Sequence, residues 1–146
     1  MGVEYYIVDD NQRRLFDLGK GPWTRFGDNP KWLQSRDGIL NFVMREYHSK
    51  DKWYVLTSEA IFWNIWLTDQ IWEFVQSTPN KKVYLDDDDN AHGKRWGDGS
   101  HIRGHGKYKI VDAYHPNSDL RPKSLRKYCD EKYGPGMDLI YKVMES

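Results

Sequence analysis

The chain has 146 residues and a mass of 17.4 kDa, which is the length of about one domain. Its 22 Lys and Arg residues balance 22 Asp and Glu residues, so no excess of one sign indicates nucleic acid, a membrane surface or an acidic partner. Aromatic residues make up 15% of the chain, seven of them Trp, and each can bury a large apolar area. We therefore expect a single globular domain over residues 1–146.

Several classes of protein are excluded by what the sequence lacks. The single cysteine, Cys129, cannot form an intramolecular disulfide and excludes a Cys-based zinc site. No apolar stretch is long enough to span a membrane. The first ten residues carry Glu4, Asp9 and Asp10 rather than a basic region, so they do not resemble a signal peptide. We expect a soluble, cytoplasmic protein that is a monomer or a homodimer.

The first residues predict a β-hairpin. Residues 3–8 are rich in β-branched and aromatic residues, and residues 14–18 form a second short apolar run. The turn formers Asp9-Asp10-Asn11-Gln12 separate them. Gly19-Lys20-Gly21-Pro22 then interrupts the pattern, and residues 23–36 are expected to be irregular.

Two helices and a short strand are predicted next. Asp37 is a good N-cap for a helix over residues 38–48, and residues 53–56 predict a strand. Thr57 or Ser58 is expected to cap a second helix over 59–76. That helix is apolar on two sides, and the two stripes are Ile61, Ile65 and Trp72, and Trp63, Leu67, Ile71 and Phe74. A helix that is apolar on two sides packs on two sides, so it is either the central core helix, which we favour, or part of a subunit interface.

The rest of the chain alternates strands and helices. Strands are predicted over 81–85 and 107–114, and a helix is predicted from Pro122 to Tyr133 with Leu125, Tyr128 and Cys129 facing inward. A final helix is expected to place inward its four apolar residues, Leu139, Ile140, Val143 and Met144. The fold class is therefore α+β, with an N-terminal β-hairpin and a small mixed or antiparallel sheet packed on about four helices.

Residues 86–106 form the segment in which the sequence concentrates polar chemistry. The segment holds five aspartates, five glycines and three histidines. A loop of this length inside a small domain is commonly functional or disordered. If it is a recognition surface, an aromatic anchor and flanking charges would carry it, and the candidates are Trp96, Lys94, Arg95, His101 and Arg103.

The aspartate run also raises the possibility of a divalent metal site. Adjacent carboxylates repel one another, and a cation relieves that repulsion. Asp86, Asp88 and Asn90 copy the first three ligand positions of a calcium loop, but Ala91 and Gly97 replace the Gly and Glu that an EF-hand requires. The candidate ligands are therefore Asp86, Asp88, Asn90 and His92, and a solvated acidic turn is the alternative. We expect no obligatory cofactor, and a divalent metal is an open alternative.

A second chemistry is indicated at the end of this segment. His105, Lys107 and Asp112 fit the spacing H-x-K-x4-D, and the spacer between Lys107 and Asp112 is strand-like. This resembles the signature of the phospholipase D superfamily, and the resemblance implies His105 as nucleophile and Lys107 as phosphate ligand. The family follows its aspartate with a Gly-Ser/Gly-x-Asn element, which residues 113–119 lack. The resemblance covers eight residues and would require a homodimer to supply two motifs.

These observations predict a non-catalytic binding protein of the inhibitor, immunity or sequestering type. It would recognise a protein partner or a compact anionic ligand through residues 86–106. No run of more than two basic residues indicates nucleic acid, and nothing indicates a membrane. The alternative is a hydrolase: either a phosphodiesterase that uses His105, Lys107 and Asp112, or an enzyme with a metal site at the aspartate cluster.

Overall fold

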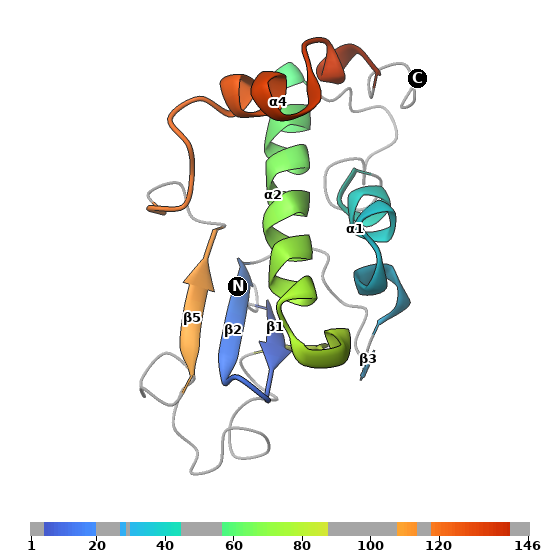
Figure 1. Cartoon of the computed structure of the whole chain (residues 1–146), viewed down its shortest axis with the longest axis vertical. Coiled ribbons are helices and arrows are strands. Elements are labelled where there is room, and N and C mark those ends of the chain that lie inside the picture. Colours follow the sequence, from blue (N-terminus) through green and yellow to red (C-terminus); the bar gives the residue numbers. More distant parts are fainter. Residues whose placement is uncertain are drawn as a thin grey trace.

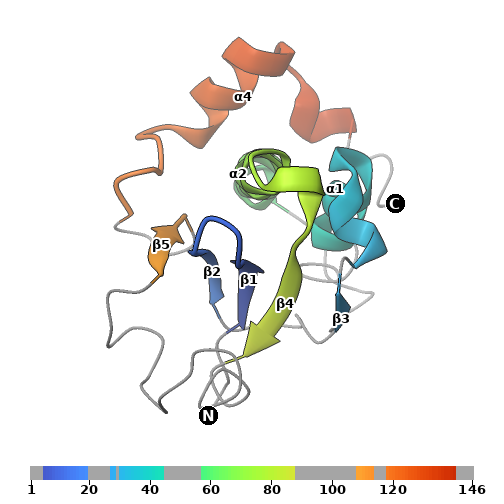
Figure 2. The ribbon, with the colours of Figure 1, turned by 60° about the horizontal axis from the view of Figure 1, so that its bottom comes forward.

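One long helix lies between a β-sheet and a second helix layer in this computed structural model (Figures 1 and 2). The structure describes residues 5–19, 27–28, 30–44, 57–87, 108–113 and 118–140. The strands are β1 (Tyr5–Asp9), β2 (Arg14–Gly19), β3 (Gly27–Asp28), β4 (Tyr84–Asp87) and β5 (Lys109–Asp112). The α-helices are α1 (Arg36–Phe42), α2 (Ser58–Gln76) and α4 (Leu125–Tyr133), and the 3-10 turns are η1 (Lys31–Gln34) and η3 (Pro79–Lys81).

The sheet is mixed and has the strand order β3-β4-β1-β2-β5. β1 and β2 form the predicted hairpin, in which Ile7 lies opposite Phe16 and Asp9 lies opposite Arg14. β4 is antiparallel to β1, whereas β5 is parallel to β2. The expected α+β fold, with its N-terminal hairpin and small mixed sheet, is confirmed.

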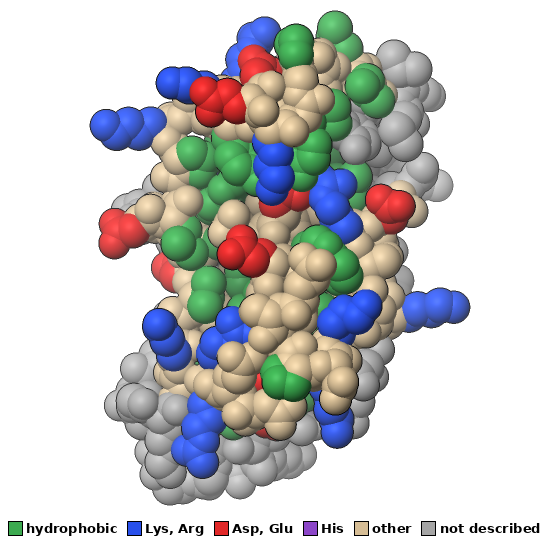
Figure 3. Space-filling model, viewed as in Figure 1, with side chains coloured by type: hydrophobic (Ala, Val, Ile, Leu, Met, Phe, Trp, Pro, Cys, Tyr) green, Lys and Arg blue, Asp and Glu red, His purple; other side chains and the backbone are tan. Residues whose placement is uncertain are grey.

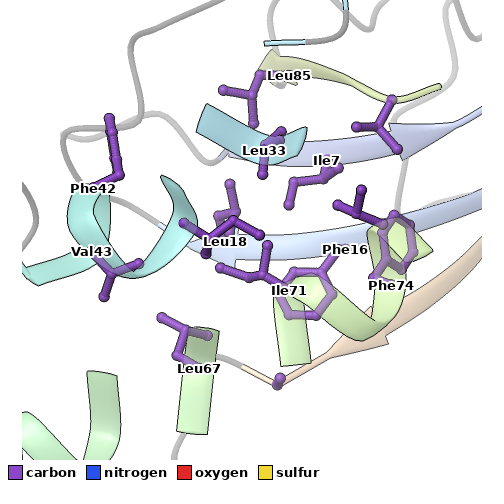
Figure 4. Packing of buried hydrophobic residues seen from close by; sticks show 14 of the residues in the cluster. Ile7, Phe16, Leu18, Leu33, Phe42, Val43, Leu67, Ile71, Phe74 and Leu85 are labelled. Atoms are coloured by element: carbon purple, nitrogen blue, oxygen red, sulfur yellow. The ribbon is translucent and has the colours of Figure 1, made fainter. Parts of the chain in front are cut away.

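The main core lies between the sheet and the helices. Strand side chains that alternate onto this face meet α1 and α2, and Phe16 packs edge-on against Phe74 with ring centroids 5.5 Å apart. Figure 4 labels ten residues of this cluster: Ile7, Phe16, Leu18, Leu33, Phe42, Val43, Leu67, Ile71, Phe74 and Leu85. On the other face of the sheet Tyr6, Val8 and Leu15 are also fully buried, so both faces of the hairpin are covered.

Helix α2 packs on two sides, as its sequence predicts. One side faces the sheet, and the other contributes Ile61, Phe62 and Ile65 to a second cluster with α1 and α4. Among the described tryptophans the most deeply buried is Trp66, which is 1% exposed and belongs to neither predicted stripe. Trp63 and Trp72 of the predicted stripes are only partly buried.

The helix ends follow from local capping chemistry. The Thr57 side chain accepts a hydrogen bond from the Ala60 amide at the start of α2, as predicted. At α1 the cap is Ser35, which accepts from the Gly38 amide, so the prediction of Asp37 was wrong by two positions. At α4 the cap is Ser124, and Pro122 precedes the helix instead of lying in its first turn.

Other boundaries and orientations also differ from the prediction. β4 begins at Tyr84 rather than at residue 81, because Asn80 and Lys81 adopt positive φ angles in η3. Leu139 and Ile140 were expected to face inward, but they are 62% and 53% exposed. Helix α1 spans Arg36–Phe42 and continues for two residues, 43–44, as π-helix, and the rest of the predicted helix, 45–48, lies outside the described residues. The predicted strand at 53–56 and the final helix positions Val143 and Met144 lie outside the described residues.

The burial pattern of α2 predicts how its tryptophans contribute to stability. Trp66→Ala should lower the free energy of unfolding by about 3–5 kcal/mol, because it leaves a large cavity in the core. Trp72→Ala on the same helix is the matched control and should cost clearly less, since its side chain is partly exposed. Urea denaturation followed by circular dichroism measures both. Equal losses in the two variants would contradict this placement of the core.

Candidate functional site

Most residues singled out from the sequence lie outside the described part of the chain. These are Asp88, Asn90, His92, Lys94, Arg95, Trp96, His101, Arg103, His105 and Lys107. Asp86 was predicted to open a loop, but its main chain belongs to β4 and pairs with Tyr6. The strand therefore extends into the segment that was expected to be loop, because its pairing with β1 continues to Asp87.

Asp112 is the one member of the H-x-K-x4-D pattern that the structure describes. It ends β5, in the predicted strand setting, and its main-chain carbonyl accepts a hydrogen bond from the Ser118 hydroxyl. Within the described ranges, no three His, Cys, Asp or Glu residues come close enough to hold a metal ion. The phosphodiesterase and metal-site hypotheses therefore stay predictions about residues outside those ranges.

Two buried carboxylates, which the sequence reasoning missed, organise the polar interactions of the fold. The first is Asp9 at the end of β1. Arg14 donates to Asp9 Oδ2 from Nε at 3.1 Å and from Nη2 at 3.0 Å, and the Thr78 hydroxyl donates to the same oxygen at 3.2 Å. The Arg14 guanidinium also lies 4.4 Å from the centre of the Phe74 ring. Asp9 thus fastens the hairpin to the C-terminal end of α2.

The second buried carboxylate is Asp69, in the middle of α2. Tyr128 and Tyr133 of α4 donate to it from their hydroxyl groups at 2.7 Å, and Arg36 of α1 donates from Nε at 2.9 Å. Lys132 Nζ lies 3.5 Å from Asp69 Oδ2. One carboxylate therefore joins α1, α2 and α4. Its sequence signal was an acidic residue in the middle of a largely apolar helix, because a charge buried there must find donors on neighbouring elements.

The same contacts explain the titration behaviour of α4. Burial, followed by the hydrogen bond to Asp69, raises the pKa of Tyr133 to about 12. Burial likewise raises the pKa of the Cys129 thiol to about 11. A buried thiol that is protonated at neutral pH is a poor nucleophile, so Cys129 acts as a small core side chain.

A cleft of about 700 Å³ opens where α2 and α4 begin. Its walls come from the first turns of both helices and from the segment that leads into α4. The lining residues are Thr57, Ser58, Glu59, Ala60, Phe62, Trp63, Arg121, Pro122, Lys123, Ser124, Leu125 and Arg126. Figure 3 shows Lys and Arg side chains at this end of the molecule and hydrophobic side chains beside α4.

Three basic side chains of the described residues line this cleft, and two of them have no acidic partner in the part of the chain that the structure describes. Neither Arg121 nor Lys123 forms an ion pair within the described ranges, whereas Arg126 lies 3.7 Å from Asp130. The Arg121 guanidinium lies 4.2 Å from the centre of the Trp63 ring. Its Nε is buried and has no hydrogen-bond acceptor. A buried donor without an acceptor is costly, and an anion in the cleft would supply the acceptor.

The two helix starts add to the positive potential of the cleft. In an α-helix the first amides have no intrahelical acceptor, and the helix dipole favours negative charge there. The amides of Ala60 and Lys127 are satisfied by the caps Thr57 and Ser124. The main-chain amides of the residues that precede Ala60 in α2 and Lys127 in α4 remain as donors for a ligand.

Acidic side chains near the cleft limit this potential only in part. Glu59 is the one carboxylate among the lining residues that the structure describes, and it is exposed. Asp138 accepts a hydrogen bond from the Ser58 hydroxyl at 2.7 Å but does not line the cleft. The described lining of the cleft therefore holds three basic side chains and one carboxylate.

A second cavity of about 320 Å³ lies between α2 and β5. Arg14 is its one basic residue, and this guanidinium is already paired with Asp9. The cleft between α2 and α4 is therefore the better candidate for binding an anion.

No helix in the described part of the chain is long and apolar enough to cross a membrane. Comparison with protein-family models, with curated proteins and with solved structures gave no match. The function is therefore inferred from the geometry of the cleft.

The arrangement around Asp69 predicts a large loss of stability when the charge is removed. Asp69→Asn should lower the free energy of unfolding by about 3 kcal/mol, because it leaves buried donors without their charged acceptor. Asp130→Asn is the matched control and should change stability by less than about 0.5 kcal/mol, since its pair with Arg126 is exposed. Chemical denaturation of the two variants measures the difference. A loss of the same small size at both positions would show that Asp69 does not join the helices.

Tyr133 predicts a loss of stability in alkali. Its folded-state pKa of about 12 lies above the ordinary value of 10.0, so the stability it contributes is present below pH 10. It is lost as the pH rises towards 12, because the unfolded chain releases the phenolic proton first. The melting temperature of the wild-type chain should fall more steeply across this interval than that of Tyr133→Phe. Parallel curves would contradict the prediction.

Proposed function

We propose that this chain is a small binding protein whose ligand is a compact anion, a phosphate ester or a comparable oxyanion, held in the α2–α4 cleft. The observation that carries the proposal is the Arg121 guanidinium, which lines the cleft, forms no ion pair with a described residue and has a buried Nε without an acceptor among the described residues. Charge-assisted hydrogen bonds from Arg and Lys to phosphate oxygens are about twice as strong as neutral ones. The cleft therefore offers a phosphate group the hydrogen-bond donors that water would otherwise supply.

The donors converge from two directions. Arg121 and Lys123 lie on the segment before α4, while the first turns of α2 and α4 present main-chain amides. Helix starts of this kind bind phosphate groups in many folds, because amides and dipole act together. The contribution of α4 depends on its being held against α2, which is the role of Asp69 with Tyr128 and Tyr133.

The chemistry of the lining supports binding rather than turnover. Among the described residues that line the cleft there is no His or Cys, and the hydroxyls of Thr57 and Ser124 are engaged as helix caps. Glu59 is the only carboxylate among them, so these residues offer no pair of acid and base. Recognition through residues 86–106, of a protein partner or of the same anion, stays a separate prediction outside the described residues.

Isothermal titration calorimetry with a phosphate monoester tests the proposal. Arg121→Gln and Lys123→Gln should each weaken binding about tenfold, because each removes a charge-assisted donor. Lys127→Gln is the matched control: Lys127 is exposed on α4 and does not line the cleft, so its loss should change the affinity less than twofold. Glu59→Gln should increase the affinity, since it removes the one negative charge in the lining.

Two results would contradict the proposal. One is the absence of binding to any phosphate ester at millimolar concentration. The other is an equal loss of affinity in Lys127→Gln and Arg121→Gln, which would indicate a diffuse effect of net charge rather than a site.

A further inference from the structure

The volume of the cleft is far larger than a phosphate group needs. Ligand sites for small organic molecules commonly enclose about 300–1,000 Å³, and this cleft of about 700 Å³ lies within that range. An inorganic phosphate ion would fill only a small part of it. The remaining wall includes apolar side chains, namely Ala60, Trp63, Pro122 and Leu125. A ligand that covers this wall needs an organic group attached to its phosphate.

The contact of Arg121 with Trp63 indicates what kind of organic group fits. A guanidinium is planar and delocalised, and it stacks on aromatic faces as well as forming hydrogen bonds. Here the central carbon of the guanidinium lies 4.2 Å from the centre of the Trp63 ring, and Arg121 also lines the cleft. A planar ring in the cleft can stack on this guanidinium, as nucleobases do on arginine side chains.

Resting on the proposed function, we propose that the ligand class is a nucleoside monophosphate. Its phosphate is bound by Lys123, by the helix starts and by an N–H at the edge of the Arg121 guanidinium, and its base stacks on the face of the same guanidinium. The combination of a phosphate with a planar ring explains why one arginine both faces the cleft and lies against Trp63. No bond is made or broken in this proposal, because the cleft binds the nucleotide without converting it.

Calorimetric titration of the full chain with four probes tests this inference. The probes are inorganic phosphate, ribose 5-phosphate, adenosine 5′-monophosphate and adenosine. The nucleotide should bind about tenfold more tightly than ribose 5-phosphate, because stacking adds to phosphate binding. Inorganic phosphate should bind more weakly than ribose 5-phosphate, and adenosine should bind more weakly than the nucleotide by at least tenfold.

Arg121→Lys separates stacking from charge. The lysine keeps the positive charge but has no planar face, so the preference for the nucleotide over ribose 5-phosphate should disappear. The affinity for ribose 5-phosphate should stay within about threefold of the wild-type value. A circular dichroism melt of the variant confirms that it is folded.

The possible results distinguish this inference from the proposed function. Equal affinities for the nucleotide and ribose 5-phosphate in the wild-type chain would overturn the nucleotide inference and leave anion binding intact. A nucleotide preference that survives in Arg121→Lys would also overturn it, since stacking on Arg121 would not be the cause. If no phosphate-bearing probe binds, or if adenosine binds as tightly as the nucleotide, anion recognition itself is wrong.

Discussion

The buried carboxylate of Asp69 is the constraint on which the arrangement of the helices depends. It lies in the central helix and has to be satisfied by donors from other elements, because an isolated charge in the core is very costly. Arg36 supplies them from α1, and Tyr128 and Tyr133 supply them from α4. Directional hydrogen bonds of this kind fix the position of α4 more narrowly than apolar packing alone would.

The position of α4 in turn creates the cleft. α4 is a polar helix whose one fully buried side chain is Cys129, so apolar burial gives it little orientation by itself. Because Asp69 holds α4 against α2, the start of α4 lies beside the start of α2. The segment before α4 places Arg121 and Lys123 at these two helix starts. The stability of the core and the geometry of the cleft therefore have a common origin. Asp9 plays the corresponding part at the other end of α2, where it holds the hairpin.

Sequence reasoning succeeded for the local patterns of the hairpin and of α2, whereas it misplaced the starts of α1 and α4. The alternation in the hairpin, the Thr57 cap and the two-sided apolar pattern of α2 each depend on residues within a few positions of one another. It failed where contacts between residues far apart in the sequence decide which side chains are buried. Leu139 and Ile140 were expected to face inward because they are apolar, yet no part of the core covers them. The buried carboxylates of Asp9 and Asp69 were passed over because several of their donors lie far away in the sequence.

The candidate site could not be predicted for the same reason, because its residues lie far apart in the sequence. The sequence drew attention to the dense polar segment at 86–106, where chemistry-bearing residues are neighbours in the chain. The cleft instead combines Arg121 and Lys123 with Trp63, about sixty positions away, and none of these is conspicuous in the sequence. An RPKS segment just before a helix was a usable signal, since it places two cations beside a helix start. What could not be predicted was that a second helix begins at the same point.

The most direct test of the central claim is a nuclear magnetic resonance titration of the uniformly ¹⁵N-labelled chain with adenosine 5′-monophosphate. The account predicts saturable shifts concentrated on the main-chain amides of Ser58, Glu59, Leu125 and Arg126, together with the indole N–H of Trp63. It also predicts that the chemical shifts of the amides around Asp9, at the opposite end of α2, stay unchanged. Shifts confined to residues outside the cleft, or an unchanged spectrum at millimolar nucleotide, would contradict it.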